Sequence, residues 1–342
     1  MQHYSQLTDA ELFELIDQYG GYRPAADALG QNYTGAFGRK CRRARDKAEA
    51  KALAFYNTGP DAPRFDNELS IEEIDAAYQK LTDRREYALD VEIILEQADY
   101  YNGVCASDVH LGPPECAYGP WTDLCNWTIE QPDTGMIFHG DAGNISTIGS
   151  PSSPAIDRLP YEDQLRLFAY NLTPLAEAGK LLLLLEGNHE DRIRRATGVK
   201  VSPMQKVADD LGVPYRGYET FVRWRITKDN NSEIYTGYHH HGRGAARTPG
   251  GVLNNLIAMA ILNRADYLAA GHTHHLFAHT LTWREVAVDG EVVVYKEPVL
   301  NTGSFQRTQG DTYATRNAFA PAVIGAGSLH LYGSKHSVHA RT

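Results

Sequence analysis

Five short polar segments carry the residue types of a metal site. Each segment follows a short apolar run, and the segments span residues 107–110, 140–144, 187–190, 239–242 and 271–274. Each one alone is uninformative, because an Asp-x-His or a single His before Gly occurs by chance in many proteins. Five such segments in one chain, each at the end of an apparent strand, together predict a metal-dependent site.

The spacing within two of these segments predicts which side chains share an ion. In an extended segment, residues i and i+2 point to the same side. Asp108 and His110 are therefore expected to face one ion, and His272 and His274 are expected to leave their strand toward the same cavity.

Two further residues supply oxygen donors to the same predicted site. Asp141 has two carboxylate oxygens and can bridge two ions, whereas Asn188 offers a neutral carbonyl oxygen. The donor set contains oxygen and nitrogen without a thiolate, which suits Mn, Fe, Zn or Co. The sequence therefore predicts a pair of borderline-hard divalent cations.

The ordered set DxH, GD, GNHE, HG and GHTH resembles the calcineurin-like metallophosphoesterase superfamily over about residues 102–310. The resemblance implies a β-sandwich flanked by helices, with two metals at the strand ends. It implies that Asp141 is shared and that His189 contacts the phosphate and protonates the leaving oxygen. It divides the ligands into a first set of Asp108, His110, Asp141 and His274 and a second set of Asp141, Asn188, His241 and His272.

The triple histidine at 239–241 leaves one ligand ambiguous. His241 is chosen because the family's ligand directly precedes the Gly; His239 shares its side of the strand, and His240 points to the opposite side. Asn144 stands where Asp is also common in the family, and residues 301–304 (NTGS) resemble the turn that often closes the family domain.

The resemblance implies hydrolysis of a phosphoester by two divalent ions. Mn²⁺ is the first expectation, with Fe, Zn, Co and Ni as alternatives. Two ions roughly 3.5–4 Å apart would lower the pKa of a bridging water, and the resulting hydroxide would attack phosphorus in line. A proton from His189 would contribute on the order of 10²–10⁴-fold.

Arginines close to these segments are candidates for binding a substrate phosphate. Guanidinium groups bind phosphate bidentately, and the candidates are Arg192, Arg243 and Arg247, with Arg194 and Arg195 as weaker ones. The competing interpretation is a solvated face or ion pairs with carboxylates.

The first 56 residues predict a small all-helical domain. Thr8 and Glu11 form a capping-box pattern that opens a helix. Three short helices with a basic third one resemble a helix-turn-helix module of the kind that phage-encoded family members can carry. Residues 39–47 hold six basic residues and one acid, and the predicted DNA contacts are Arg39, Lys40, Arg42, Arg43 and Arg45. The alternative is a helical docking domain.

Residues 57–100 are predicted to be a linker and connector helices, the last one reaching about Gln97. Residues 101–342 are predicted to form the metallophosphoesterase domain, an α+β layered fold. Its expected strands include 136–139, 181–186, 234–238 and 267–270, and a helix is expected over 252–262.

Composition narrows the class of protein. The chain has 342 residues, a net charge of −10 and 14 histidines, more than average usage gives. It has four cysteines with no CxxC pair and no long apolar run, so a reduced cytoplasmic protein without a membrane segment is expected. The predicted function is a phosphodiesterase or nuclease that acts on DNA. The alternatives are a small-molecule or nucleotide phosphatase, and a DNA-binding regulator with a structural metal site.

Overall fold

The computed structural model divides the chain into two units, Met1–Glu86 and Tyr87–Thr342. It describes residues 88–147, 154–199, 201–310, 312–316 and 321–342, together with residues 7, 8, 11, 12, 25, 28, 29 and 40.

The described residues of the first unit confirm the start of its first helix. The Thr8 amide donates to the Glu11 carboxylate at 2.8 Å, and the Glu11 amide donates to Thr8 Oγ1 at 3.3 Å, which is the reciprocal capping box. Lys40 Nζ donates to the Leu7 carbonyl at 2.9 Å. The other predicted DNA contacts and the linker lie outside the described residues, so the helix-turn-helix module stays a prediction.

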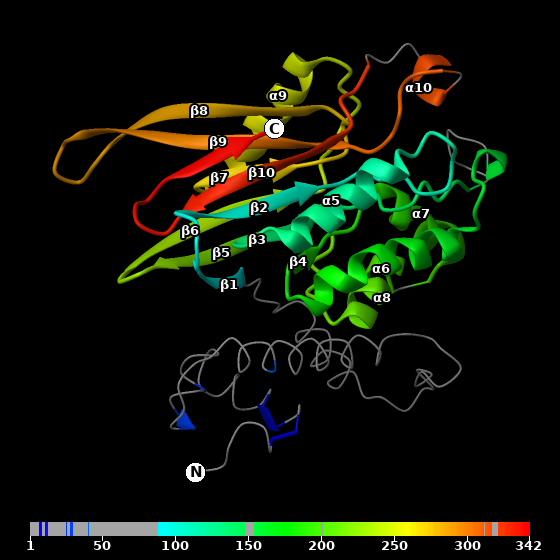
Figure 1. The fold of residues 1–342 in the computed structure, drawn as a ribbon. Helices are drawn as coiled ribbons and strands as arrows, with labels where there is room; N and C mark the ends of the chain where they lie inside the picture. Colours follow the sequence, from blue (N-terminus) through cyan, green and yellow to red (C-terminus); the bar gives the residue numbers. More distant parts are fainter. Residues whose placement is uncertain are drawn as a thin grey trace, which may run out of the picture. The chain divides into compact units, whose positions relative to one another are not determined.

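The second unit is built on a mixed sheet of 11 strands among its described residues, in the order β1-β5-β6-β7-β9-β10-β2-β3-β4 (Figure 1). This path holds nine of the 11 strands, and the other two lie off it, because β8 pairs with β9 and β11 pairs with β10. The strands are β1 (Leu89–Ile94), β2 (Tyr100–Ala106), β3 (Thr134–Phe138), β4 (Leu181–Leu184), β5 (Glu219–Lys228), β6 (Asn231–His240), β7 (Tyr267–Ala270), β8 (Leu276–Val286), β9 (Val292–Ser304), β10 (Gly325–Tyr332) and β11 (Val338–Arg341).

The sheet is folded into two halves that face each other. Only a short pairing joins β9 to β10, through Ser304 with Gly325 and Gly303 with Ala326. One buried cluster takes side chains from both halves, and the rings of Tyr101 on β2 and Trp224 on β5 lie 5.7 Å apart across it. The expected sandwich of sheet faces is therefore present, with an apolar core between the halves.

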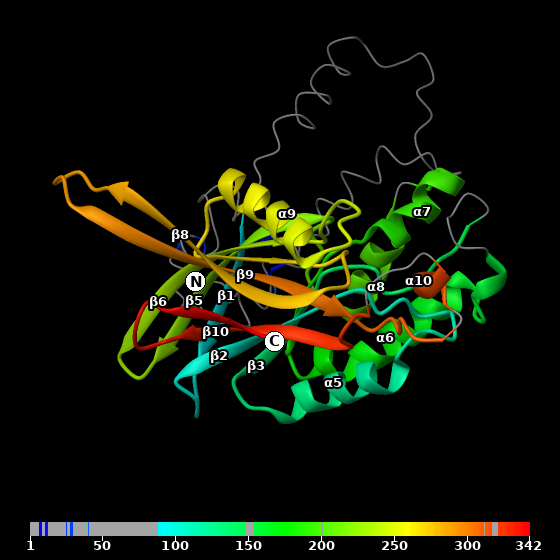
Figure 2. The same cartoon turned by 90° about the horizontal axis from the view of Figure 1, so that it is seen from above.

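Helices cover the outer face of each half. The half formed by β2, β3 and β4 packs against α5 (Tyr118–Glu130), α6 (Tyr161–Glu177) and α8 (Pro203–Leu211), and the other half packs against α9 (Pro249–Leu262) (Figures 1 and 2). Separate buried clusters fill these two interfaces. The short helices are η2 (Pro154–Ile156), α7 (Asn188–Thr197) and α10 (Tyr313–Arg316).

One expected element is wrong. The connector helix expected up to about Gln97 is absent over residues 89–94, which form β1 and pair in parallel with β5 from Leu89–Val222 to Ile94–Thr227. Leu89 is buried in the core between the sheet halves. The alternation of apolar and acidic residues in LDVEII fits a half-buried strand at least as well as a helix, and pairing with β5 decides between them.

The β8–β9 hairpin extends well beyond the other strands in both views (Figures 1 and 2). No helix among the described residues is long and apolar enough to cross a membrane.

Candidate metal centre

The predicted ligands meet at one edge of the sandwich, where parallel strands end. β2, β3 and β4 run in parallel, as do β6 and β7, so their carboxyl ends lie on the same side. Asp108 and His110 follow β2, Asp141 follows β3, and Asn188 begins α7 after β4. His241 follows β6, and His272 and His274 follow β7, which completes the predicted set.

The ligand side chains form two groups. Asp108, His110 and His274 each place one donor atom within 4.8 Å of the others, and so do Asp141, His241 and His272. In the first group, Asp108 Oδ1 lies 3.3 Å from His274 Nε2 and 3.7 Å from His110 Nε2. These two groups are subsets of the two predicted ligand sets, and a further group of the same kind joins His110 and Asp141 to His189.

Asp141 lies between the two groups. Its Oδ2 atom is 3.4 Å from Nε2 of His241 and 4.0 Å from Nε2 of His110, so one carboxylate oxygen faces a member of each group. Its other oxygen, Oδ1, accepts the His189 amide at 2.9 Å, which fixes the orientation of the carboxylate. This is the placement that a bridging ligand needs.

Hydrogen bonds fix which ring nitrogen of two histidines faces the centre. His241 Nδ1 lies 2.6 Å from the His139 carbonyl, so Nδ1–H donates to that oxygen. Nε2 is then the nitrogen that can bind a metal, and it lies 3.1 Å from Asn188 Oδ1. His272 Nε2 lies 2.9 Å from the Gly244 carbonyl, which leaves Nδ1 as its metal-facing atom. Such partners of the outer nitrogen orient metal-binding imidazoles.

The expectation of extended backbone at the Asp-x-His and His-x-His segments is wrong. Asp108 and His110 have φ of 53° and 50°, and His272 and His274 have φ of 71° and 59°. These residues are therefore in the left-handed region and not in extended strand. Asp and His enter this region more readily than most residues, and such strain gathers at functional sites.

Buried charge makes the centre favourable for cations. Burial alone would raise the pKa of Asp108, but hydrogen bonds from His110 and His274 hold it well below its ordinary value. Burial alone would lower the pKa of His241, but the Asp141 carboxylate raises it to about 10. The two buried carboxylates thus demand positive charge, which divalent cations would supply more fully than a single imidazolium.

The triple histidine separates into three environments. His241 is the member whose ring lies with Asp141 and His272. His240 points elsewhere, since its Nδ1 accepts the Gly242 amide at 2.6 Å. His239 is fully buried and pairs with His139 in the core between the sheet halves, away from the metal ligands.

No family model and no curated protein matches the sequence. Solved structures do match. A single mutant of Vps29 from Entamoeba histolytica is 15% identical, covering 70% of this chain and 97% of that one with a TM-score of 0.32. A predicted phosphoesterase from Streptococcus pneumoniae is 11% identical, covering 71% and 90% with a TM-score of 0.31. Vps29 from Cryptosporidium parvum is 14% identical, covering 71% and 97% with a TM-score of 0.31.

The second unit is an α/β domain with a mixed sheet flanked by helices. The likeness to solved structures concerns the arrangement of strands and helices. The grouping of the candidate ligands rests on the distances within the chain itself.

Glu190 is a site residue that the sequence analysis did not assign, although it ends the GNHE segment. Its fully buried carboxylate accepts the amides of Gly187 at 2.9 Å, Asp141 at 3.1 Å and Ala142 at 2.7 Å. It therefore joins the turn after β3 to the start of α7 and fixes the backbone that carries two predicted ligands. The only sequence signal was an acid at the fourth position of the segment.

Residues 301–304 (NTGS) form hydrogen bonds with the loops that carry candidate ligands. Asn301 Nδ2 donates to Thr273 Oγ1 at 3.0 Å and to the His275 carbonyl, so it holds the backbone between and after the two terminal histidine ligands. Ser107 Oγ lies 2.6 Å from Thr302 Oγ1 and also donates to the Asp108 carboxylate. Both contacts fix a ligand-bearing loop.

The arginine candidates divide into three groups. Arg192 lies at the centre, with its guanidinium 2.8 Å from His189 Nε2 and 3.2 Å from the Asn144 carbonyl. Arg194 and Arg195 donate instead to the buried Asp191 carboxylate. This supports the competing interpretation, an ion pair with a carboxylate, for both residues. Arg243 and Arg247 are exposed in the loop whose Gly244 carbonyl contacts His272.

Proposed function

We propose that this protein is a metal-dependent phosphoester hydrolase with a dinuclear centre. The observation that carries the proposal is the position of Asp141, whose Oδ2 faces His110 on one side and His241 on the other. Two ligand groups that share one carboxylate are suited to two ions held close together.

The residues fit the implied cations. Asp108, His110, Asp141 and His274 would hold one ion, and Asp141, Asn188, His241 and His272 would hold the other. Oxygen and imidazole donors favour Mn²⁺, Fe, Zn²⁺ or Co²⁺. When bound, such ions neutralise phosphate oxygens and activate water.

His189 and Arg192 would act on the substrate. Burial lowers the pKa of His189 to about 3, so the ring is neutral at pH 7. Its Nδ1 contacts the Asn144 carbonyl and its Nε2 accepts from Arg192. An incoming phosphate would compete for the guanidinium and stabilise a proton on Nε2, from which the leaving oxygen could take it.

Replacing Asp141 with Ala tests the dinuclear centre. Loss of the shared oxygen should abolish Mn²⁺-dependent hydrolysis of bis(p-nitrophenyl) phosphate and lower the content of bound metal. Asp123→Ala is the matched control, because Asp123 is an exposed residue of α5. Full activity of Asp141→Ala would contradict the proposal of a dinuclear centre that shares Asp141.

We further propose that the substrate is a phosphodiester of DNA. The support is the basic segment at residues 39–47, in a chain whose net charge is otherwise strongly negative. A panel of single- and double-stranded DNA, RNA, cyclic nucleotides and a simple monoester would rank the substrate classes. A monoester preference would favour the alternative, a small-molecule or nucleotide phosphatase.

The role of the basic segment has its own test. Arg42→Glu with Arg43→Glu should weaken DNA binding and flatten its dependence on salt, because each lost phosphate contact reduces the salt slope by about one. Hydrolysis of bis(p-nitrophenyl) phosphate should not change. Unaltered DNA affinity would assign the segment to another partner.

A further inference from the structure

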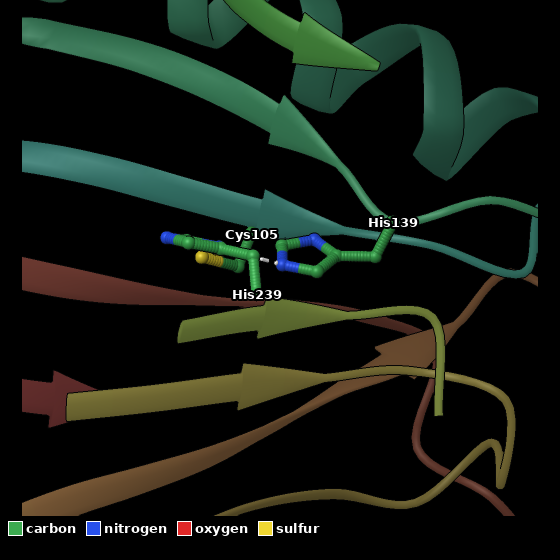
Figure 3. Close-up of side chains that lie close together, drawn as sticks. All are labelled: Cys105, His139 and His239. Atoms are coloured by element: carbon green, nitrogen blue, oxygen red, sulfur yellow. Dashed lines mark hydrogen bonds between the residues drawn. The ribbon is translucent and has the colours of Figure 1, made fainter. Parts of the chain in front are cut away.

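A second group of potential metal donors lies in the core between the sheet halves. Cys105 is on β2, His139 follows β3, and His239 is on β6 (Figure 3). All three side chains have no exposed surface. They come from both halves of the sandwich, so whatever they bind would join the two sheets.

The donor atoms are close enough to converge on one cation. One atom from each side chain lies within 4.8 Å of the others. His139 Nε2 and His239 Nδ1 are 2.9 Å apart, and Figure 3 shows the His139 ring directed toward His239. Zinc bonds of about 2.0–2.1 Å to nitrogen and 2.3 Å to sulfur place tetrahedral donors about 3.3–3.6 Å apart. Side-chain shifts of about 1 Å would reach that spacing.

A neighbouring hydroxyl is placed as an orienting partner. His239 Nε2 lies 2.9 Å from Tyr267 Oη, and Trp224 Nε1 donates to the same oxygen at 2.5 Å. With Nε2–H donating to Tyr267, the lone pair of His239 Nδ1 faces His139. Metal-binding histidines usually have such a partner on the outer nitrogen.

Hydrogen bonds within the described residues do not satisfy all the polar atoms of Cys105, His139 and His239. His139 Nδ1 is buried and has no hydrogen-bond partner among the described residues. Within the described part of the chain, the hydrogen bond of the Cys105 thiol is a weak contact of 3.7 Å to the Gly103 carbonyl.

We propose that Cys105, His139 and His239 bind a third cation of the thiophilic class, Zn²⁺ or Cu⁺, as a structural link between the sheet halves. The thiolate sets this site apart from the catalytic centre, whose donors are oxygen and nitrogen only. Binding forms the metal–sulfur bond and releases the Cys105 thiol proton to solvent. The proposal does not depend on the hydrolase activity.

Cobalt spectroscopy tests the site in the full chain. Because the cluster is fully buried, the protein should be refolded with Co²⁺, which gives a charge-transfer absorption in the near ultraviolet only when a thiolate is bound. We expect this absorption in the wild type and in Cys125→Ser, a buried cysteine of α5 outside the cluster. In Cys105→Ser we expect the absorption to disappear and the content of bound metal to fall by one equivalent.

A second variant separates this proposal from the catalytic one. Asp141→Asn should lose catalytic metal and activity but keep the thiolate absorption. Metal analysis of the wild type after expression distinguishes zinc from copper. A wild-type protein without the absorption, or a signal that disappears in Cys125→Ser, would overturn the proposal and leave the His139–His239 hydrogen bond as the whole content of the cluster. The wild-type spectrum decides even if Cys105→Ser fails to fold.

Discussion

Substituting Gly187 with Ala should disable the centre although no candidate ligand is replaced. Gly187 precedes α7 with φ of −102° and ψ of 176°, a conformation that alanine adopts readily. A Cβ atom there would lie 2.7 Å from Asp141 Cγ and would overlap Asp141 Oδ1 and the Asp141 amide. The obstacle is therefore space and not backbone conformation.

The size of the effect follows from that overlap. Carbon atoms pack best at about 3.5–4.0 Å, so the Asp141 carboxyl must move by about 0.8 Å or more. Overpacking of this kind costs about 1–3 kcal/mol, which corresponds to a fall in Tm of roughly 2–12 °C for a domain of this size. A displacement near 1 Å at reacting groups costs on the order of 100-fold in rate.

The assay is Mn²⁺-dependent hydrolysis of bis(p-nitrophenyl) phosphate, measured with the Tm and the bound metal. Gly119→Ala is the matched control, because no atom lies within 4 Å of the added Cβ on α5. Gly119→Ala should keep wild-type rates. If Gly187→Ala also keeps wild-type rate and metal content, the contact between this turn and Asp141 is not what positions the shared carboxylate.

Three further substitutions give separate readouts. His189→Ala should lose about 10²–10⁴-fold in rate while metal content stays constant, and a parallel loss of metal would make His189 a ligand. Asn301→Ala frees the backbone beside two ligands and should weaken metal affinity about 10–100-fold in a titration with Mn²⁺, whereas unchanged affinity would deny it a supporting role. Burial raises the pKa of Glu297 from 4.5 to about 8, so its contribution to stability is complete below pH 4.5 and is lost as pH rises through 8. Urea midpoints of Glu297→Gln should therefore fall less than those of the wild type between pH 5 and pH 9, and equal falls would contradict the assignment.

The sequence predicted the ligand-bearing segments because metal chemistry restricts residue types strongly. Short apolar runs ending in Gly, Asp or His identified four strand ends, and the predicted strand at residues 267–270 matches β7. The expected helix over 252–262 differs from α9 by its first turn only, where Pro249 begins the helix after the Thr248 cap.

Features that depend on tertiary contact were not predictable. The left-handed conformation of Asp108 and His272 arises from loops held by distant residues, and no local pattern encodes it. The role of Glu190 depends on three amides brought together by the fold. The strand at residues 89–94 becomes a strand because β5, more than a hundred residues later, offers an edge.

The position of β10 governs the order in which this domain can be completed. β10 pairs with β2 from Gly327–Cys105 to Tyr332–Tyr100, and it is also the strand that meets β9 at the seam between the sheet halves. During synthesis, β3 can cover one edge of β2, but the other edge must wait for a partner more than two hundred residues downstream. Such long-range pairing slows folding, because the entropy of closing the loop is lost before the contacts form. A ribosome-bound chain that ends before residue 325 would thus expose an unpaired β2 edge, and it would be a target for chaperones before the domain is complete.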